Sequence, residues 1–378
     1  MLMDQTSPSF DDADFLLQLW PDLLLSGKDR RVQIHDSACY SMLLQYFWQE
    51  MTMVEESPES FAITKPAGFV SLVARIQAIA SSGISRTEAL QVARELVVEE
   101  APSEDQLMAS VDVAVRLWLT VDVSSFKSRR QGLLSWKSTE TLSEVVQAHF
   151  RNLEQEQPFL TPAADRGQVD SNLTAKFLVK YRGYNIIWTS NLAVHLAIDW
   201  EYKTITVYEH KVFLDNQLKY LTSSSGLPIP PAVLEEAIDT LNLLFPFQVD
   251  SAKRFLAKHK KPFYGLGSCG RPRKLDISDY RYWRSRVSDL GHITTGPPVG
   301  LQQLRLHNKG ENLLQFATFW TAIAVGAFTV ASIAIGLAAL VYGKKQYELG
   351  LRQYQVSVYQ LCLDPEAGSK FPDLCLKS

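Results

Sequence analysis

The chain has 378 residues, of which 46% are hydrophobic and 21% are charged, and its formal net charge is −3. These values are ordinary for a globular protein, so the soluble part can bury a real core, as two domains or one large one. The four cysteines, Cys39, Cys269, Cys362 and Cys375, are too few and too scattered for a disulfide scaffold or a zinc site.

Residues 1–154 are predicted to form a helical domain. The first fifteen residues are acidic and lack the apolar stretch of a secretory signal. Ser85 with Glu88, and Ser103 with Gln106, have the spacing of capping boxes, and each pair precedes an apolar stripe. The sequence therefore predicts two helices that begin directly after Ser85 and Ser103.

The predicted helices at 69–80 and 86–99 are joined by a short glycine turn, which is also the outline of a helix-turn-helix. The second helix carries Glu95, Glu99 and Glu100 with few cations, and DNA phosphates would repel it. We therefore interpret the pair as a packed helical hairpin and expect no nucleic-acid partner.

Residues 155–175 are polar and rich in turn formers, and they are predicted to be a linker. Residues 176–250 follow as a predicted small α+β domain. Alternating apolar residues in this part predict a β-hairpin, then a short capped helix, and then a third strand. The hairpin strands are expected at 177–181 and 184–188, the helix at 191–199, the third strand at 204–208, and later helices at 211–221 and 232–245. The predicted fold class is α+β, predominantly helical: an N-terminal helical region, a small β-β-α-β unit and one C-terminal transmembrane helix.

Residues 251–311 are predicted to be a basic juxtamembrane segment. Residues 251–290 contain eleven Lys or Arg and three acids, so this stretch has a charge of about +8. Polybasic segments are attracted to the anionic cytoplasmic leaflet of a membrane. The cations taken as candidates for this contact are Arg271, Arg273, Lys274, Arg281, Arg284 and Arg286.

Residues 312–343 form an uncharged run that predicts a transmembrane helix. About 20 helical residues cross a bilayer, so the run is long enough with room for tilt. Phe316, Phe319 and Trp320 lie toward one end and Tyr342 and Tyr347 toward the other, as interfacial aromatic belts require. The lipid bilayer is therefore the first predicted partner.

Alanines recur within this run at spacings of three and four residues. Small residues on one face allow helix backbones to approach closely in lipid, so this stripe predicts self-association into a homo-oligomer. The stripe consists of Ala324, Ala327, Ala331, Ala334 and Ala338.

Residues 344–378 are predicted to be a short helical tail. Apolar residues recur there as a heptad seam, which is typical of a coiled coil. The seam consists of Tyr347, Leu351, Tyr354, Val358 and Leu361. Cys362 and Cys375 bracket a Pro- and Gly-containing segment, and they are expected to be bridged if the tail lies outside the cytosol and free thiols if it lies inside.

The large N-terminal part is predicted to be cytosolic. The basic segment before the membrane and the acidic N-terminus without a signal both favour this orientation. The cations next to the two helix ends are nearly balanced, with Arg305 and Lys309 before the run and Lys344, Lys345 and Arg352 after it.

Enzymatic motifs are sparse. His195, Asp199 and His210 are the one constellation that could carry catalysis, and we interpret them as part of a capped surface helix instead. Residues 265–270 spell GxGxxG, but no apolar strand precedes them and no apolar helix follows, so a loop is expected. We expect no cofactor, no metal and no catalytic residues, and we lean away from an enzyme.

Three short segments carry a resemblance to a known family. They are WTSNLAVHL at 188–196, LFP at 244–246 and YWRSR at 282–286, followed by an aromatic-led membrane helix at Phe319 and Trp320. In this order they resemble a group of filamentous-fungal membrane-anchored proteins of uncharacterised activity. The resemblance covers about residues 175–345 and implies a C-terminal membrane helix, but no catalytic residues.

The sequence thus favours a single-pass, membrane-anchored interaction or regulatory protein with a protein partner of unknown kind. Two alternatives stay open. One is a membrane-bound enzyme that uses His195, Asp199 and His210. The other is a divergent relative of CorA-type transporters, although this chain has one membrane helix rather than two, and only Thr321, Thr329 and Ser332 as polar lining.

Overall fold

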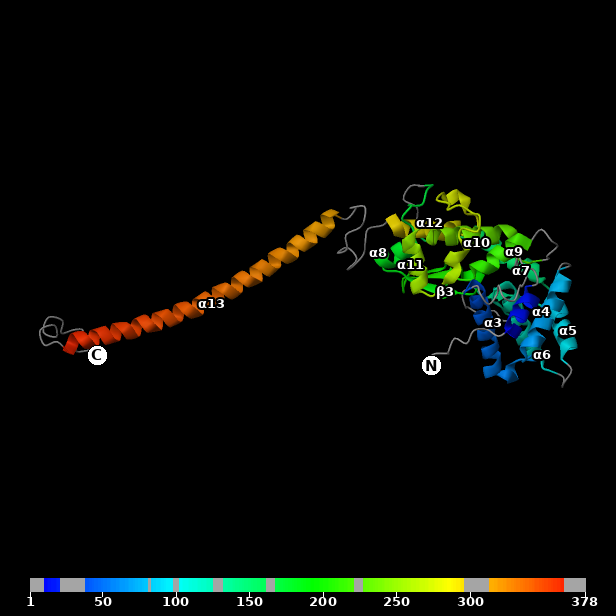
Figure 1. Cartoon of the computed structure of the whole chain (residues 1–378), viewed down its shortest axis with the longest axis horizontal. Helices are drawn as coiled ribbons and strands as arrows, with labels where there is room; N and C mark the ends of the chain where they lie inside the picture. Colours follow the sequence, from blue (N-terminus) through cyan, green and yellow to red (C-terminus); the bar gives the residue numbers. More distant parts are fainter. Residues whose placement is uncertain are drawn as a thin grey trace. The chain divides into compact units, whose positions relative to one another are not determined.

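A computed structural model describes residues 10–20, 38–80, 83–97, 102–124, 132–160, 167–220, 227–295 and 313–363. The chain divides into two compact units, residues 1–299 and 300–378, which we call unit 1 and unit 2. Figure 1 shows unit 1 as packed helices around a small sheet and unit 2 as one long helix.

Helices make up the N-terminal part of unit 1, as predicted, and Figure 1 shows them gathered on one side of it in blue and cyan. Both predicted capping boxes are present: the Ser85 and Ser103 side chains accept from the N–H groups of Glu88 and Gln106. Thr141 and Glu144 form a third box before α7. The elements are α1 (Phe10–Leu19), α3 (Ala38–Glu56), α4 (Pro66–Ala80), α5 (Arg86–Leu96), α6 (Glu104–Leu119) and α7 (Leu142–Glu154).

The sheets are small, and the predicted hairpin is wrong in its first strand. The strands are β1 (Val123–Ser124) and β2 (Leu134–Ser135), which pair in parallel, and β3 (Asn185–Thr189), β4 (Ile198–Asp199) and β5 (Thr204–Tyr208). The second sheet has the order β3-β5-β4, with β3 parallel and β4 antiparallel to β5. Strands β3 and β5 confirm the predicted strands at 184–188 and 204–208.

Residues 177–181 lie in helix α8 (Ala175–Arg182) instead of a strand. The Thr174 side chain caps its N-terminus, and Gly183, with φ 74°, ends it by donating its N–H to the Leu178 carbonyl. These two end signals outweigh five residues of alternating pattern. The predicted helix at 191–199 is a short 3-10 helix (Leu192–Val194) followed by β4.

The rest of unit 1 is built around α10 (Pro231–Leu244). Eleven of its fourteen residues are buried, so it is a core helix whose polar side chains need partners inside the protein. The surrounding elements are α9 (Lys211–Tyr220), α11 (Asp250–Lys258), the 3-10 helices Pro262–Leu266 and Ile277–Asp279, and α12 (Arg284–Thr295).

The predicted domains 1–154 and 176–250 share one hydrophobic core. The Tyr40 hydroxyl donates to Asn216 Oδ1 at 3.3 Å, and the hydroxyls of Thr120 and Tyr208 are 2.8 Å apart, so contacts join the two parts directly. Residues 155–175, the predicted linker, therefore connect two parts of one compact unit.

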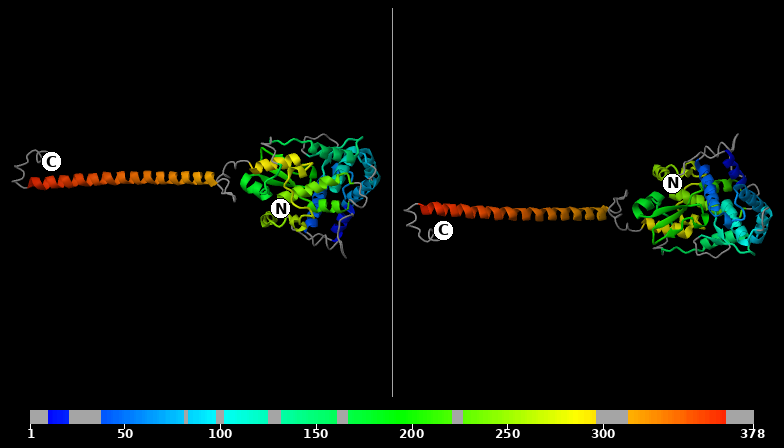
Figure 2. Two further views of the ribbon diagram at one scale, coloured as in Figure 1. Left: turned by 90° about the horizontal axis from the view of Figure 1, so that it is seen from above. Right: turned by 90° about the horizontal axis from the view of Figure 1, so that it is seen from below.

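Unit 2 contains α13 (Leu313–Leu363), one helix of 51 residues. Both views of Figure 2 show it unbroken through the predicted membrane run and into the predicted tail. Cys362, in its last turn, is disulfide-bonded, whereas Cys269 in unit 1 is a free thiol. Cys375 lies outside the described residues, as do residues 296–311 of the predicted basic segment.

Candidate functional site

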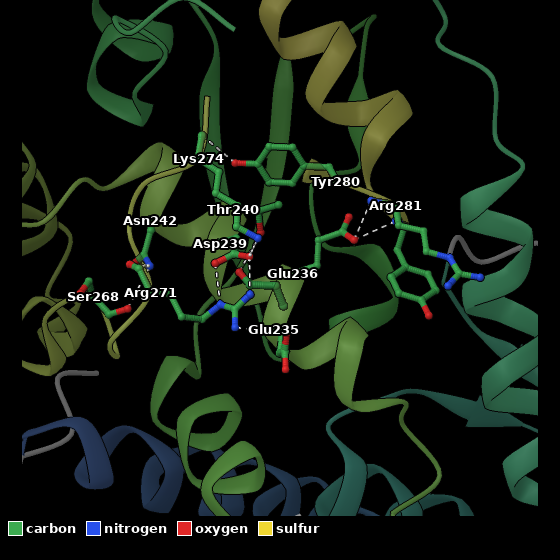
Figure 3. Close-up of polar contacts among 12 residues, drawn as sticks. Glu235, Glu236, Asp239, Thr240, Asn242, Ser268, Arg271, Lys274, Tyr280 and Arg281 are labelled. Atoms are coloured by element: carbon green, nitrogen blue, oxygen red, sulfur yellow. Dashed lines mark hydrogen bonds and ion pairs between the residues drawn. The ribbon is translucent and has the colours of Figure 1, made fainter. Parts of the chain in front are cut away.

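Cations of the basic segment bind a buried carboxylate of α10, that of Asp239. Asp239 is 1% exposed, and its two oxygens accept from Nε and Nη2 of Arg271, each at 2.7 Å. Lys274 Nζ lies 2.8 Å from Asp239 Oδ2, and Arg271 also reaches Glu235 at 3.2 Å. Figure 3 shows Asp239 held between these two cations. A bidentate arginine pair fixes geometry as well as charge, so this segment is locked onto the helix.

One turn earlier on α10, Glu236 binds the residues directly before α12. Its carboxylate accepts from three consecutive backbone N–H groups, those of Arg281, Tyr282 and Trp283, at 2.7, 3.0 and 2.7 Å. Burial raises the pKa of Glu236, and the three N–H donors oppose that rise. These N–H groups belong to the three residues directly before α12, so Glu236 fastens the segment that leads into that helix.

Two further predicted cations bind backbone carbonyls. Arg273 donates to the carbonyls of Ser171, Leu173 and Leu243 at 2.7–3.2 Å. Arg286 Nη1 donates to the His195 carbonyl at 2.6 Å, and its Nε donates to Glu156 Oε2 at 3.1 Å.

Arg281 pairs with Glu154 at 2.9 Å, and Arg284 is exposed. Of the six predicted juxtamembrane cations, five are therefore engaged inside unit 1. Their predicted contact with the membrane stays a prediction. In unit 1 these side chains bind carboxylates and backbone carbonyls.

His195 is a buried structural histidine. Its Nδ1 accepts from the Tyr208 N–H at 3.0 Å, so Nε2 carries the proton and donates to Thr240 Oγ1 at 2.7 Å. Burial, reinforced by the Arg286 charge, lowers the pKa of His195 to about 3. Both ring nitrogens are engaged, so this imidazole is not available as a general base.

The structure does not bring Asp199 into a site with the histidines. Asp199 is exposed, and its Oδ1 accepts from the N–H groups of Glu201 and Tyr202 in a turn. His210 is buried against the rings of Tyr46 and Tyr208, and neither of its nitrogens has a hydrogen-bond partner. Among the described residues, no group of three His, Cys, Asp or Glu side chains could hold a metal.

The GxGxxG at 265–270 begins in the last two residues of the 3-10 helix Pro262–Leu266 and continues as a turn, and its carbonyl groups bind side chains of unit 1. Lys211 Nζ donates to the Gly267 carbonyl at 2.7 Å, and Asn242 Nδ2 donates to the carbonyls of Ser268 and Arg271 at 3.0 and 3.1 Å. A dinucleotide fingerprint presents N–H groups to the ligand. Here the loop uses its carbonyls as acceptors to fasten itself to α9 and α10.

The three segments that carry the family resemblance meet inside unit 1. Trp188 stacks on Phe245, with ring centroids 5.6 Å apart. His195 meets Trp283 edge-on at 5.3 Å, and its carbonyl binds Arg286. Tyr282 and Trp283 are buried, so these rings pack within unit 1. The three segments thus form one structural junction assembled from three parts of the chain.

Sequence reasoning missed a second, partly buried polar cluster between the N-terminal helices and the sheet. Asn191 caps the 3-10 helix, and its Nδ2 also donates to Asp122 Oδ2 and the Gly132 carbonyl at 3.0 and 3.1 Å. Thr120, which ends α6 at φ 52°, accepts the Leu192 N–H on its carbonyl. These partners lie 59 to 72 positions apart, so no local pattern marked them.

In unit 2, α13 is the one helix among the described residues that is long and apolar enough to cross a membrane. Its regular winding gathers the five stripe alanines on one face. The hydroxyls of Thr321, Thr329 and Ser332 each donate to the carbonyl four residues earlier, at 2.7–2.9 Å. The polar groups of the span are thereby satisfied within the helix itself.

The alanine stripe and the heptad seam lie on different faces of α13. Four seam residues follow a stripe alanine by 20 positions, as Leu351 follows Ala331. At 3.6 residues per turn, 20 residues rotate a straight helix by about 200°. Four of the five seam side chains are exposed, with Tyr347 at 71%, and Val358 is half-buried.

No family model, curated protein or solved structure matches this chain, so its function has to be inferred from its own residues.

Proposed function

We propose that this chain is a single-pass membrane protein that acts as a non-enzymatic interaction or regulatory protein and self-associates through α13. The observation that carries the proposal is α13 itself. It is about 76 Å long at ~1.5 Å per residue, more than twice a hydrocarbon core of about 30 Å. Its side chains from Ala317 onward are almost all exposed. Such a helix needs lipid along part of its length and a protein surface along the rest.

The proposed orientation has unit 1 in the cytosol and the end of α13 on the opposite side. The cysteines support it, because Cys269 in unit 1 is a free thiol while Cys362 is disulfide-bonded. Disulfides persist in oxidising compartments and are rare in the cytosol.

The orientation is tested by labelling sealed vesicles with a membrane-impermeant maleimide. We expect Cys269 of unit 1 to react from the cytosolic side, and Cys362 to react only after reduction and permeabilisation. Cys269 is the half-exposed thiol, so it is the reporter, and its replacement by serine is the control. Labelling of Cys362 from the cytosolic side without a reductant would reverse the orientation.

Self-association is proposed through the stripe of Ala324, Ala327, Ala331, Ala334 and Ala338. Small side chains let two backbones approach, and lipid supplies no competing hydrophobic drive. Because the heptad seam faces away from the stripe, a pair formed through the alanines leaves the seam uncovered for another protein surface.

The test compares two alanine-to-leucine variants of the full chain by cross-linking in native membranes. Ala331→Leu fills the stripe and is expected to lower the cross-linked fraction severalfold. Ala322→Leu is the matched control, since nine residues rotate the helix by about 180° and put it on the opposite face. Equal cross-linking in both variants would show that the stripe is not the contact.

The alternatives gain no support from the described residues. An enzyme based on His195, Asp199 and His210 lacks a shared site, because Asp199 lies in an exposed turn and both His195 nitrogens are engaged. A transporter pore would need free polar groups in the span, and the hydroxyls of Thr321, Thr329 and Ser332 are bonded to their own helix.

Membership of the filamentous-fungal membrane-anchored group is likewise proposed. The contacts Trp188–Phe245 and His195–Trp283 support it, since they give the shared segments a common structural purpose. In members of the group, residues at these paired positions are expected to change together. Independent variation at the paired positions would remove this support.

A further inference from the structure

Four exposed cations lie close together in the sequence, on α11 and in the turn after it. Lys253, Arg254, Lys258 and Lys260 are all exposed, and none of them forms an ion pair with an acid among the described residues. The one acid within the helix is Asp250 in its first turn. The cations of α11 thus differ from the predicted cations at 271–286, most of which bind partners within unit 1.

The neighbouring basic residue shows how specific this exposure is. Lys261 turns inward, pairs with Glu209 and lies over the Trp188 ring at 5.3 Å. Ala252 and Leu256 form the buried side of α11 and fix its rotation. The helix is therefore seated on unit 1 by its apolar side, and its cations are directed to solvent by that seating.

Exposed apolar side chains adjoin these cations. Phe247 and Val249, directly before α11, are 43% and 39% exposed. Gln248 between them has φ 69°, a left-handed turn that holds both side chains at the surface. The Phe247 ring rests on Tyr264, at a centroid distance of 5.4 Å, so it is held in place while exposed.

We propose that Phe247, Val249, Lys253, Arg254, Lys258 and Lys260, which we call the α11 face, dock onto an anionic bilayer surface. Cations beside exposed aromatic and aliphatic side chains match the two layers of such a surface, phosphate-bearing headgroups and the acyl boundary beneath them. Each Lys or Arg near an anionic surface strengthens binding roughly fivefold, and the effects of the four cations multiply.

This inference rests on the proposed membrane anchor. A chain already tethered to a bilayer meets its surface at high effective concentration, so a weak face is sufficient. The occupant is the membrane of the same anchor. The phosphate backbone of a nucleic acid would offer charge but no apolar layer for Phe247 and Val249.

The test reconstitutes the full chain in nanodiscs of phosphatidylcholine, with and without phosphatidylserine, and follows amide hydrogen exchange. We expect exchange across 247–260 to slow severalfold only in the phosphatidylserine discs. The variant Lys253→Glu, Arg254→Glu, Lys258→Glu, Lys260→Glu should lose this slowing. The matched control reverses four exposed cations elsewhere, with Lys65→Glu, Arg94→Glu, Arg151→Glu, Lys203→Glu, and should keep it.

Carbonate extraction of the same proteins keeps the two ideas apart. Retention in the membrane with unchanged exchange at 247–260 overturns the α11 face and leaves the anchor intact. Loss of the unmodified chain on extraction refutes the anchor itself. Slowing caused by an added RNA oligonucleotide but not by phosphatidylserine would also overturn the proposal, in favour of a nucleic-acid partner.

Discussion

Arg286 Nη1 donates a 2.6 Å hydrogen bond to the backbone carbonyl of His195, 91 positions earlier in the chain. Nε of the same guanidinium donates to Glu156 Oε2 at 3.1 Å, and Glu156 lies two residues after the end of α7. One side chain of α12 thereby joins the turn before β4 to the exit of the N-terminal helices. Both ends of the carbonyl bond are buried, so water cannot replace a lost partner.

Replacing Arg286 with methionine is expected to destabilise unit 1 by about 2–4 kcal/mol, because it leaves the buried His195 carbonyl without a donor. The measurement is chemical unfolding of the full chain in detergent micelles. Arg284→Met, two positions earlier and exposed, is the control and should change stability by less than about 0.5 kcal/mol. Similar losses in both variants would mean that the Arg286 bond contributes little.

Gly132 is a second position where a small substitution is expected to disturb the packing of unit 1. It has φ 78°, and a Cβ there would lie 2.0 Å from Cγ1 of Val194. Gly132→Ala is therefore expected to cost more than about 2 kcal/mol, from the clash and the left-handed backbone together. Gly265→Ala is the control, because nothing lies within 4 Å of its added Cβ. Thermal melting of both variants distinguishes a local effect from a general intolerance of Gly-to-Ala changes.

His210 predicts how stability depends on pH. Burial, with the Lys261 charge, lowers its pKa to about 3 in the folded chain, against 6.5 for an ordinary histidine. Between these values the unfolded chain binds more protons, so stability is full at neutral pH and falls as the pH drops below about 6.5. At pH 5 the loss from His210 is about 2 kcal/mol.

His210→Phe should therefore flatten the fall in stability between pH 7 and pH 5 by about the same amount. At pH 7 it should not destabilise, because the ring nitrogens of His210 have no hydrogen-bond partner to lose. Unfolding curves at the two pH values provide the measurement. An unchanged pH dependence would show that His210 is solvated or paired in the native state.

The capping box at Ser103 gives a smaller, local prediction. Ser103→Ala removes the acceptor for the Gln106 N–H and is expected to cost about 1 kcal/mol. Ser71→Ala is the control, since its exposed hydroxyl bonds only the Ala67 carbonyl inside α4. Denaturant midpoints compare the two, and equal shifts would contradict a capping role.

The helices were readable from sequence where their ends carry local chemistry. Ser85 and Ser103 lie three residues before their partners, so the signal and the structure occupy the same short window. At α8 two local patterns disagree. Five alternating residues predict a strand, whereas Thr174 and Gly183 are the end signals of a helix, and the helix forms. The long apolar run of α13 also needed no tertiary information.

The buried network could not be read in this way. Asp239 and Arg271 are 32 positions apart, and Glu236 meets its three N–H donors 45 to 47 positions away. In the sequence, Arg271 and Lys274 look like solvent-facing charge, because a cation and its buried acid carry no local mark of each other. Only the packing of α10 as a core helix separates these residues from the exposed cations of α11.

The 20-residue offset along α13 limits the assemblies that its two apolar faces can build. A parallel pair joined through the alanines has its two heptad seams pointing outward, in opposite directions. Contacts through those seams would join pair to pair and would not close on themselves. Copies using both faces would extend as rows in the plane of the bilayer, with a length set by surface density rather than by a fixed subunit number.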